Sequence, residues 1–317
     1  MSYQIPLEEE TRDLGFGSVV TRESRQRLLN RNGTFNVERT GLSFWSSLSP
    51  YQSLLNMPWW KFHIVIALFY LTANLVFALA YYLCGPAGLE EQSGGPLPSF
   101  LKAFFFSVQT IATVGFGHIH PVGVAANLIV TIESLFGLLS FALATGLMFT
   151  RFSKPTAKIL FSDKAVIAPY RGIKAFELRI ANARKNQIME LQAKVLFSWL
   201  EGPAHRRVRR FDNLTLEREK VVFFPLSWTL VHPIDEISPL KGLTPEDLHN
   251  SDAEFLVLLT GIDETFSELV HARSSYKSRE LVWDAKFEPI FNPPTPSHHI
   301  SIDIRKLSSL IAAREDT

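Results

Sequence analysis

One short segment, Thr113-Val-Gly-Phe-Gly117, holds the residue types and spacing best suited to chemistry. Glycines at alternate positions allow backbone conformations that a Cβ disfavours, so that successive carbonyl oxygens can point the same way. Rings of such carbonyls, supplied by several chains, can replace the water shell of a dehydrated cation. The Thr113 hydroxyl can add an innermost oxygen, while Val114 and Phe116 point away from the ring. The segment therefore predicts an ion-selectivity filter with residues 113–117 as its ion-binding part.

The elements around this segment are those that a filter requires. Residues 62–84 predict an outer helix and residues 122–152 an inner helix, each apolar and long enough to cross a bilayer core of about 30 Å. Residues 99–112 are a shorter apolar run, opened by a Pro-Ser signal, and predict a pore helix that enters the membrane and turns back. Such a re-entrant segment persists in lipid only where it is buried in protein or lines water. One chain supplies part of a carbonyl ring, so we expect a fourfold homotetramer.

Composition agrees with a membrane part joined to a soluble part. The 317 residues include 32 Lys+Arg, 31 Asp+Glu and 25 Phe, and 46% of the residues are hydrophobic. The net charge of +1 gives no case for a nucleic-acid-binding protein. A single cysteine, Cys84, excludes an intrachain disulfide framework and a cysteine-rich metal site. Because no nucleophile, base and orienting group stand out together, we expect no enzyme, no cofactor and no metal beyond the permeant ion.

The predicted organisation has five parts. In chain order these are an N-terminal cytoplasmic segment (1–42), an interfacial slide helix (43–58), the transmembrane pore domain (59–157), a cytoplasmic β-sandwich (158–291) and a C-terminal tail (292–317). The slide helix is expected because Trp, Phe and Leu alternate there with Ser and Gln, as in helices that lie at a membrane surface. The sandwich is expected from several short apolar stretches that alternate with turn-rich segments. The tail is expected to be loosely structured.

Basic residues predict the orientation in the membrane. Several arginines precede the first span, and Arg151, Lys154 and Lys158 follow the second, whereas the intervening loop has only Lys102. The positive-inside rule therefore places both termini in the cytosol. Arg151, Lys154 and Lys158 can also bind anionic lipid headgroups, each worth about 1 kcal/mol near a charged surface. The alternative is that these residues only set the topology.

Longer motifs resemble those of a known family. They are Ser107-Val-Gln-Thr-Ile-Ala-Thr-Val-Gly-Phe-Gly117, Arg151-Phe-Ser-Lys-Pro155, Leu226-Ser-Trp-Thr-Leu-Val-His-Pro-Ile-Asp-Glu-Ile-Ser-Pro-Leu240 and Ala272-Arg-Ser-Ser-Tyr276. With these motifs, residues 40–290 resemble the inward-rectifier potassium (Kir) channels, most closely the prokaryotic members. The resemblance implies a two-span α-helical pore domain, an immunoglobulin-like cytoplasmic sandwich, potassium as the permeant ion, a homotetramer and a bacterial inner membrane.

The resemblance also implies two gates. The bundle-crossing gate falls at Phe149, and helical spacing places the possible pore-lining residues Leu138, Phe141 and Thr145 on the same stripe. Four Phe149 rings can then close the pore by dewetting. The Gly261-Ile262 loop matches the family's cytosolic constriction, with Ile262 as a second hydrophobic ring.

Other residues of the pore domain have a supporting role in this interpretation. Glu133, an acid within a span, is a functional candidate by default; it lies about 160° around the helix from Phe149 and is expected to hydrogen-bond behind the filter. Gln109 is a second filter-support residue. Gly137 and Gly146 are either bending points or small residues for close helix packing.

Departures from the family pattern limit the prediction. Many members have Tyr where Phe116 stands, and some have Glu where Gln109 stands. Strong rectifiers carry acids near the position of Phe141 and at that of Thr260, and those acids hold Mg²⁺ or polyamine blockers. We therefore expect weak rectification, with modulation by anionic phospholipid. Two alternatives stay open: a two-span potassium channel gated by an unknown ligand, and a non-conducting membrane sensor with the same fold. The basic run Arg206–Arg210 is expected to be a solvated hairpin tip.

Overall fold

The computed structural model describes residues 27–36, 50–91, 98–153, 158–184, 186–203, 207–293 and 300–313. The chain divides into two compact units. The helical unit is Thr40–Lys154, and the β-rich unit combines Met1–Arg39 with Pro155–Thr317.

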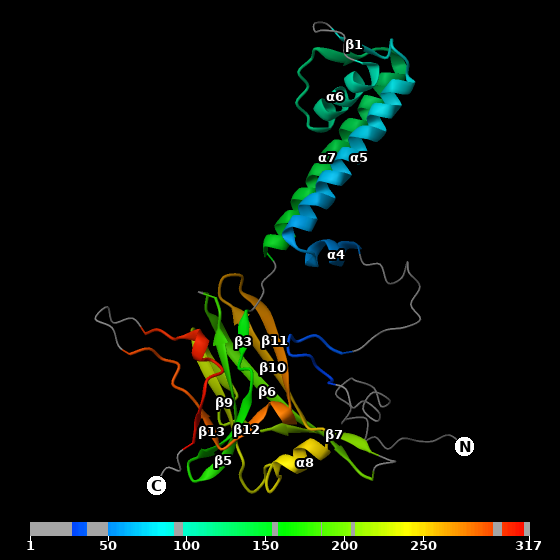
Figure 1. The fold of residues 1–317 in the computed structure, drawn as a ribbon. Helices are drawn as coiled ribbons and strands as arrows, with labels where there is room; N and C mark the ends of the chain where they lie inside the picture. The colour runs from blue at the N-terminus through cyan, green and yellow to red at the C-terminus, as the bar shows by residue number, and fades with distance from the viewer. Residues whose placement is uncertain are drawn as a thin grey trace. The chain divides into compact units, whose positions relative to one another are not determined.

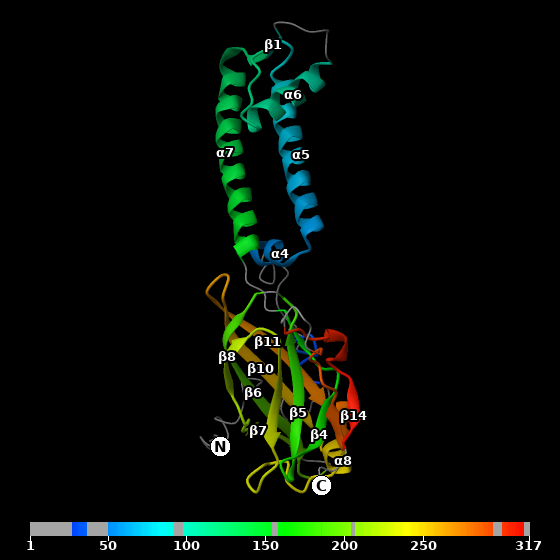
Figure 2. The ribbon, with the colours of Figure 1, turned by 90° about the vertical axis from the view of Figure 1, so that its left-hand side faces the viewer.

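Four helices form the described part of the helical unit (Figure 1). They are α4 (Pro50–Asn56), α5 (Trp59–Leu83), α6 (Ser99–Ile111) and α7 (Gly123–Ser153). Helices α5 and α7 are long and apolar enough to cross a membrane, with mean hydropathies of 2.1 and 1.9. Figure 2 shows α6 beside one end of these two helices and α4 at the other end. The two spans and the re-entrant helix are therefore present as separate helices.

Helix boundaries lie close to the predicted ones, and the differences have local causes. Helix α5 begins at Trp59 because Pro58, with φ −55° and ψ 148°, stands at its N-cap and has no N–H to place in the helix. Helix α4 covers Pro50–Asn56 of the expected slide helix 43–58. The first part of that prediction, residues 43–49, lies outside the described residues.

A small antiparallel sheet joins the segment before α6 to the segment that follows residues 113–117. Strand β1 (Leu89–Glu91) pairs with β2 (Ile119–Pro121), and Glu90 stands opposite His120. The imidazole Nε2 of His120 lies 3.6 Å from a carboxylate oxygen of Glu90. The sheet therefore fixes the chain on both sides of residues 113–117.

Two five-stranded sheets form the β-rich unit. The first has the order β11-β10-β6-β7 with β8 also on β6, and the second the order β12-β4-β5-β3 with β9 also on β5. The strands of the first sheet are β6 (Ile188–Glu201), β7 (Val208–Leu214), β8 (Lys220–Phe224), β10 (Glu254–Asp263) and β11 (Glu268–Lys277). Those of the second are β3 (Ile159–Phe161), β4 (Ala165–Tyr170), β5 (Ile173–Asn182), β9 (Ser227–Pro233) and β12 (Leu281–Trp283). A short helix, α8 (Pro245–Asn250), precedes β10.

Apolar side chains of the two sheets meet in a common core. Phe176 of β5 stacks on Phe255 of β10 with ring centroids 4.4 Å apart, and Phe197 of β6 lies 5.1 Å from Phe255. All three side chains are fully buried. Because inward-facing residues alternate along each strand, the short alternating stretches of the sequence become the two inner faces of a sandwich. The predicted all-β sandwich is confirmed.

The expectation of a loose C-terminal tail is wrong for its described residues. Strand β14 (Leu310–Ala312) pairs with β13 (Ala285–Phe287), and the short helix η2 (Ile304–Lys306) precedes it. Leu307 is only 6% exposed and packs with Ala181 and Ile290. The polar composition of the tail hid the few apolar residues that attach it to the sandwich.

The basic run 206–210 also differs from the prediction. Arg209 of β7 is only 3% exposed and forms an ion pair with Asp252 at 2.6 Å. Its guanidinium also donates to the hydroxyl of Ser198 at 3.2 Å. The expectation of a solvated tip is therefore wrong for Arg209, which lies on the same face of the sheet as Ser198, opposite the inward-facing Phe197, and is buried there by its partners.

Candidate functional site

The backbone of residues 113–117 alternates in handedness. Thr113, Gly115 and Gly117 have φ values of 57°, 53° and 82°, whereas Val114 and Phe116 between them do not have positive φ. This alternation is what turns successive carbonyl groups to one side of the chain. A Cβ on Gly115 would meet nothing within 4 Å, so backbone conformation rather than space requires glycine there. Thr113 adopts a conformation that is rare for a β-branched residue, as strained residues at functional sites do.

The end of α6 holds the base of this segment. The amide of Val114 donates to the carbonyl of Gln109 at 2.9 Å, and that of Gly115 donates to the same carbonyl at 3.4 Å. Thr113 donates to the carbonyl of Thr110 at 3.0 Å. These bonds make the segment a direct continuation of the last turn of α6. The C-terminal end of α6, with its partial negative charge, therefore lies beside the innermost oxygens.

A buried polar cluster joins α6 to both long helices. Glu133 of α7 is fully buried and accepts hydrogen bonds from the hydroxyls of Tyr81 on α5 and Ser107 on α6. The Ser107 hydroxyl also lies 3.2 Å from Oδ1 of Asn74. Asn74 and Ser107 have no exposed surface either. Tyr81, Ser107 and Asn74 were not among the predicted site residues, although a Tyr and an Asn within an apolar span were a usable signal.

Two filter side chains have little cover from their own chain. Val114 is 54% exposed and Phe116 is 72% exposed in the single subunit. The Phe116 ring lies 6.3 Å from the imidazole of His118. A tetramer would have to cover these apolar groups with a neighbouring subunit, since burying them is favourable at about 25 cal/mol per Å².

The side chains of the predicted pore-lining stripe of α7 are largely exposed in the single subunit. Leu138, Phe141 and Phe149 are 61%, 74% and 71% exposed. Thr145 is exposed too, and its hydroxyl donates to the carbonyl of Phe141 at 2.9 Å. Other apolar side chains of α7, such as Leu143, are equally exposed, so exposure alone does not single out the stripe.

The two glycines of α7 differ in their surroundings. A Cβ on Gly137 would lie 3.0 Å from the carbonyl oxygen of Ile111 at the end of α6, so this glycine permits close packing. A Cβ on Gly146 would meet nothing within 4 Å. Helix α7 runs unbroken through both positions. Of the two explanations left open for Gly137, the structure favours close packing.

Of the three predicted lipid-binding residues, Arg151 and Lys158 are described, and they belong to different units. The Arg151 guanidinium donates to the carbonyl of Leu54 and, at 2.7 Å, to that of Met57, at the end of α4. It also lies 4.6 Å from the ring centre of Trp59 and 4.5 Å from that of Phe62. Arg151 thus binds α4 and α5 instead of presenting its donors to a headgroup. Lys158 is exposed and belongs to the β-rich unit, and Lys154 lies outside the described residues.

The predicted Gly261-Ile262 loop is instead part of a strand. Both residues lie in β10, where the pairing with β6 shifts register between Thr260 and Ile262. A Cβ on Gly261 would come within 2.6 Å of the Ile188 side chain. The irregular pairing keeps Ile262 half-buried near the end of the strand, before the turn to β11.

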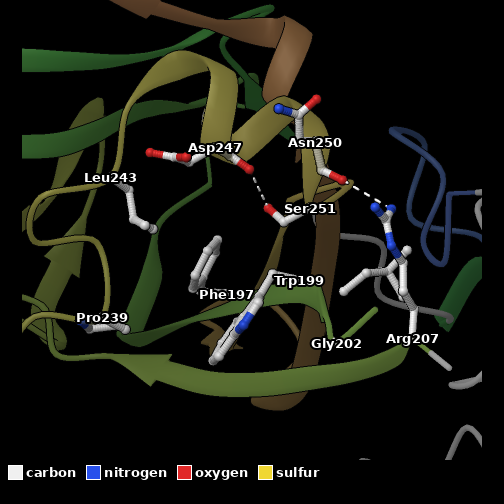
Figure 3. Close-up of a pocket in the computed structure, with 10 residues that line it drawn as sticks. Phe197, Trp199, Gly202, Arg207, Pro239, Leu243, Asp247, Asn250 and Ser251 are labelled. Carbon is white, nitrogen blue, oxygen red and sulfur yellow. Dashed lines mark hydrogen bonds between the residues drawn. The ribbon is translucent and has the colours of Figure 1, made fainter. Parts of the chain in front are cut away.

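The β-rich unit has a pocket of about 410 Å³ (Figure 3). Polar groups that line it form hydrogen bonds within the fold. Ser251 donates to the carbonyl of Asp247 at 2.7 Å, and Arg207 donates to that of Asn250 at 3.2 Å. The Asp247 carboxylate caps α8 by accepting from Thr244, which holds the pKa of that carboxyl below its usual range. These groups stabilise α8 and do not form a set of catalytic residues.

Comparisons with known proteins agree with this geometry. The family model "Inward rectifier potassium channel C-terminal domain" matches residues 159–315, and the model "Ion channel" matches residues 69–154. The inward rectifier potassium channel Kirbac3.1 of Paramagnetospirillum magnetotacticum is 41% identical over 288 residues, which cover 90% of this chain and 96% of that protein. ATP-sensitive inward rectifier potassium channel 12 of Mus musculus is 28% identical over 307 residues, covering 87% of this chain and 70% of that protein.

The two long apolar helices and the family match over residues 69–154 define a membrane-spanning ion channel. More narrowly, the chain belongs to the inward rectifier potassium channel family. Potassium is therefore the permeant ion, and the protein is a channel and not an enzyme. Channels of this family are tetramers, as closure of the carbonyl ring requires.

Proposed function

We propose that four copies of this chain conduct potassium through the filter of residues 113–117, a cavity lined by Leu138, Phe141 and Thr145, and a gate at Phe149. The observation that carries the proposal is the alternating backbone of Thr113, Gly115 and Gly117, joined to the end of α6. The membrane is a bacterial inner membrane with both termini in the cytosol, in keeping with the basic residues after α7.

The central test is rubidium-86 uptake into liposomes that contain the purified tetramer. We expect uptake that barium blocks, because barium fits the same carbonyl sites as potassium with twice the charge. Well-folded tetramers without uptake, at any lipid composition, would point to the non-conducting sensor. Uptake that barium does not affect would remove the filter assignment.

Phe149 is the proposed bundle-crossing gate, and Ile262 a second constriction in the β-rich unit. Phe149→Ala should raise basal rubidium uptake several-fold, because a wider and wetter constriction removes the dewetting barrier. Leu143→Ala is the matched control, since Leu143 is 66% exposed on the same helix but lies off the stripe, two residues from both Phe141 and Thr145. Equal uptake by the two variants would remove Phe149 from the gate.

Weak rectification is the proposed response to internal Mg²⁺ and polyamines. Phe141 and Thr260 stand where strong rectifiers have acids, and the Thr260 hydroxyl lies 3.1 Å from the His271 imidazole and not beside a carboxylate. Without an acid at these positions a multivalent blocker loses its electrostatic partner. Phe141→Asp should therefore increase voltage-dependent block by Mg²⁺.

Anionic phospholipid is the proposed modulator, acting through Lys154 and Lys158. Arg151 is left out of this lipid site, because its guanidinium is bound to the carbonyls of α4. A direct test is to vary phosphatidylglycerol in the uptake assay for the wild type and for Lys158→Gln. The lysine variant should respond less to the lipid, and an unchanged response would favour gating by another ligand.

A further inference from the structure

A pocket is lined by residues from the end of α5 and the beginning of α6. Figures 1 and 2 show where these two helices lie together in the helical unit. Its volume is about 270 Å³. The lining residues are Tyr81, Tyr82, Gly85, Pro86, Leu89, Ser99, Lys102 and Ala103. The pocket belongs to neither the filter nor the proposed lipid residues after α7, so the conduction path leaves it unexplained.

Lys102 supplies the charge of this pocket. Its ammonium donates one hydrogen bond, at 3.2 Å, to the carbonyl of Leu89, and an ammonium has three donors. Among the residues that the structure describes, Lys102 forms no ion pair, and Glu90 nearby on β1 is paired with His120. A half-buried positive charge with spare donors is complementary to an anion, and the Ser99 hydroxyl lines the same pocket.

The surroundings of the pocket place it at the boundary between lipid and water. Helix α5 ends at Leu83, which is 76% exposed, next to Tyr82, which is 50% exposed. Tyrosines at the end of a span lie at headgroup level. The Tyr82 ring contacts that of Phe100 edge-on at 6.0 Å, and Phe100 is 40% exposed. These rings form an apolar surface beside the charged pocket.

The direction of α6 places the pocket on the outside of a tetramer. The last turn of α6 leads into the filter, and the filter of a fourfold channel surrounds the symmetry axis. Ser99 and Lys102 lie at the opposite end of α6, and the whole helix is about 20 Å long. This end therefore faces away from the axis, toward the lipid.

We propose that the pocket binds the phosphate-bearing headgroup of an anionic phospholipid in the leaflet on the filter side, one lipid for each subunit. Lys102 and Ser99 bind the phosphate, and an acyl chain lies along Tyr82 and Phe100. The lipid neutralises the Lys102 charge and packs against the joint between α5 and α6.

Native mass spectrometry of the intact tetramer, titrated with phosphatidylglycerol or phosphatidylcholine, tests the proposal. The wild type should bind phosphatidylglycerol more tightly than phosphatidylcholine, with up to four sites. Lys102→Gln keeps an N–H for the Leu89 carbonyl but removes the charge, and should weaken phosphatidylglycerol binding about five-fold. Lys102→Arg should retain the preference, and Lys61→Gln, at the other end of α5, should change it less than two-fold.

Three outcomes would overturn the proposal. They are equal binding of the two lipids by the wild type, an equal effect of the two glutamine variants, and displacement of the lipid by millimolar glycerol phosphate. The last would show that a free phosphate, without acyl chains, is the ligand. Because the readout is binding to a tetramer of verified mass, the result does not depend on whether the channel conducts.

Discussion

Glu133 is buried in the helical unit with hydrogen-bond donors from two other helices. Tyr81 of α5 and Ser107 of α6 both donate to its carboxyl group. Acids within a membrane are retained where they have such partners, because an unsatisfied polar group in hydrocarbon is costly. The carboxyl group of α7 therefore connects α6 to both long helices. The contact on α6 is Ser107, two residues before Gln109.

Glu133→Gln tests this hydrogen-bonded connection. The amide keeps the volume but offers one acceptor oxygen in place of two, so either Tyr81 or Ser107 loses its acceptor. A buried hydroxyl left without an acceptor weakens the junction by about 1–3 kcal/mol. We expect a lower melting temperature of the tetramer and a lower rubidium-to-sodium uptake ratio. A variant that melts earlier but keeps the uptake ratio would limit Glu133 to a structural role.

His232 in the β-rich unit is a buried titratable residue that sequence patterns gave no reason to choose. It is 3% exposed, its Nδ1 donates to the carbonyl of Thr215 at 2.6 Å, and its Nε2 accepts from Ser238 at 2.8 Å. Burial lowers the pKa of this imidazole, and the bond to Thr215 and the charge of Asp235 offset the effect only in part.

The pKa of His232 predicts a loss of stability in mild acid. Below the ordinary pKa of about 6.5 the unfolded chain takes up a proton that the folded chain still excludes. Stability should therefore fall as the pH drops from about 6.5 toward the lowered folded pKa. His232→Asn keeps a donor for Thr215 and does not titrate, so the melting temperature of the full-length variant should fall less between pH 7.5 and 5.5. Parallel falls for both proteins would contradict this assignment.

At the scale of elements, Arg151 connects the end of α7 to α4. Two carbonyls at the end of α4 accept from its guanidinium, which also lies over Trp59 and Phe62. A planar group with several donors can bind both carbonyls and stack on rings at once, which an ammonium cannot do. Phe149, the proposed gate, is two residues earlier on the same helix, so displacement of α4 acts directly on the gate segment.

Arg151→Lys should release α4 without removing the positive charge. We expect hydrogen exchange at residues 50–56 to rise at least five-fold, measured by mass spectrometry on the reconstituted tetramer. Lys61→Arg, at the same end of α5, is the control and should leave exchange unchanged. If Arg151 were a lipid ligand instead, the variant would differ from wild type only when anionic lipid is present.

The elements differ in how well the sequence predicts them. Long apolar runs and strict alternation reveal α5, α7 and the sandwich, because these patterns report burial over many residues. Partners far apart in sequence leave no such pattern. The binding of Arg151 to Leu54, the Asp252 partner of Arg209 and the pairing of β14 with β13 each depend on contacts that only the fold brings together.

The predicted filter and its surroundings show the same limit of sequence-based prediction within a single site. The alternating backbone of residues 113–117 was predictable because the glycine spacing is a local backbone requirement, and the role of these residues stays a prediction. The support behind it was predicted only at Glu133 and Gln109, since Tyr81, Ser107 and Asn74 come from two separate helices. The Gly261-Ile262 position was assigned to a loop through the family resemblance, whereas both residues lie in β10 at a shift in its pairing with β6.

At the scale of the whole molecule, the chain enters and leaves the helical unit from neighbouring places on the sandwich. Residues 27–36 precede that unit and residues 158–163 follow it. The Arg31 guanidinium joins the two segments by donating to the carbonyl of Ser162 at 2.8 Å, and it lies 5.4 Å from the ring centre of Tyr276. One side chain of the β-rich unit therefore joins the segment that precedes the helical unit in sequence to the segment that follows it.

Glu254 is the buried residue that holds residues 27–36 in place. It has no exposed surface, and its carboxylate accepts from the amides of Leu28 at 3.0 Å and Leu29 at 3.2 Å. Lys277 lies 3.2 Å from the same carboxylate, and Leu28 and Leu29 pack on Leu256. Backbone amides bound to a buried carboxylate are among the stronger hydrogen bonds in proteins.

Glu254→Gln should detach this segment while the sandwich stays folded, since Lys277 keeps its second ion pair with Asp252 at 3.0 Å. Losing charge-assisted bonds worth about 1.5–3 kcal/mol should speed exchange of the Leu28 and Leu29 amides at least ten-fold. Glu246→Gln, an exposed acid on α8, is the matched control and should leave exchange unchanged. Equal exchange in the two variants would mean that the apolar packing of Leu28 and Leu29 holds the segment without the carboxylate. Faster exchange together with altered rubidium uptake would instead show that the attachment of this segment to the sandwich influences the gate.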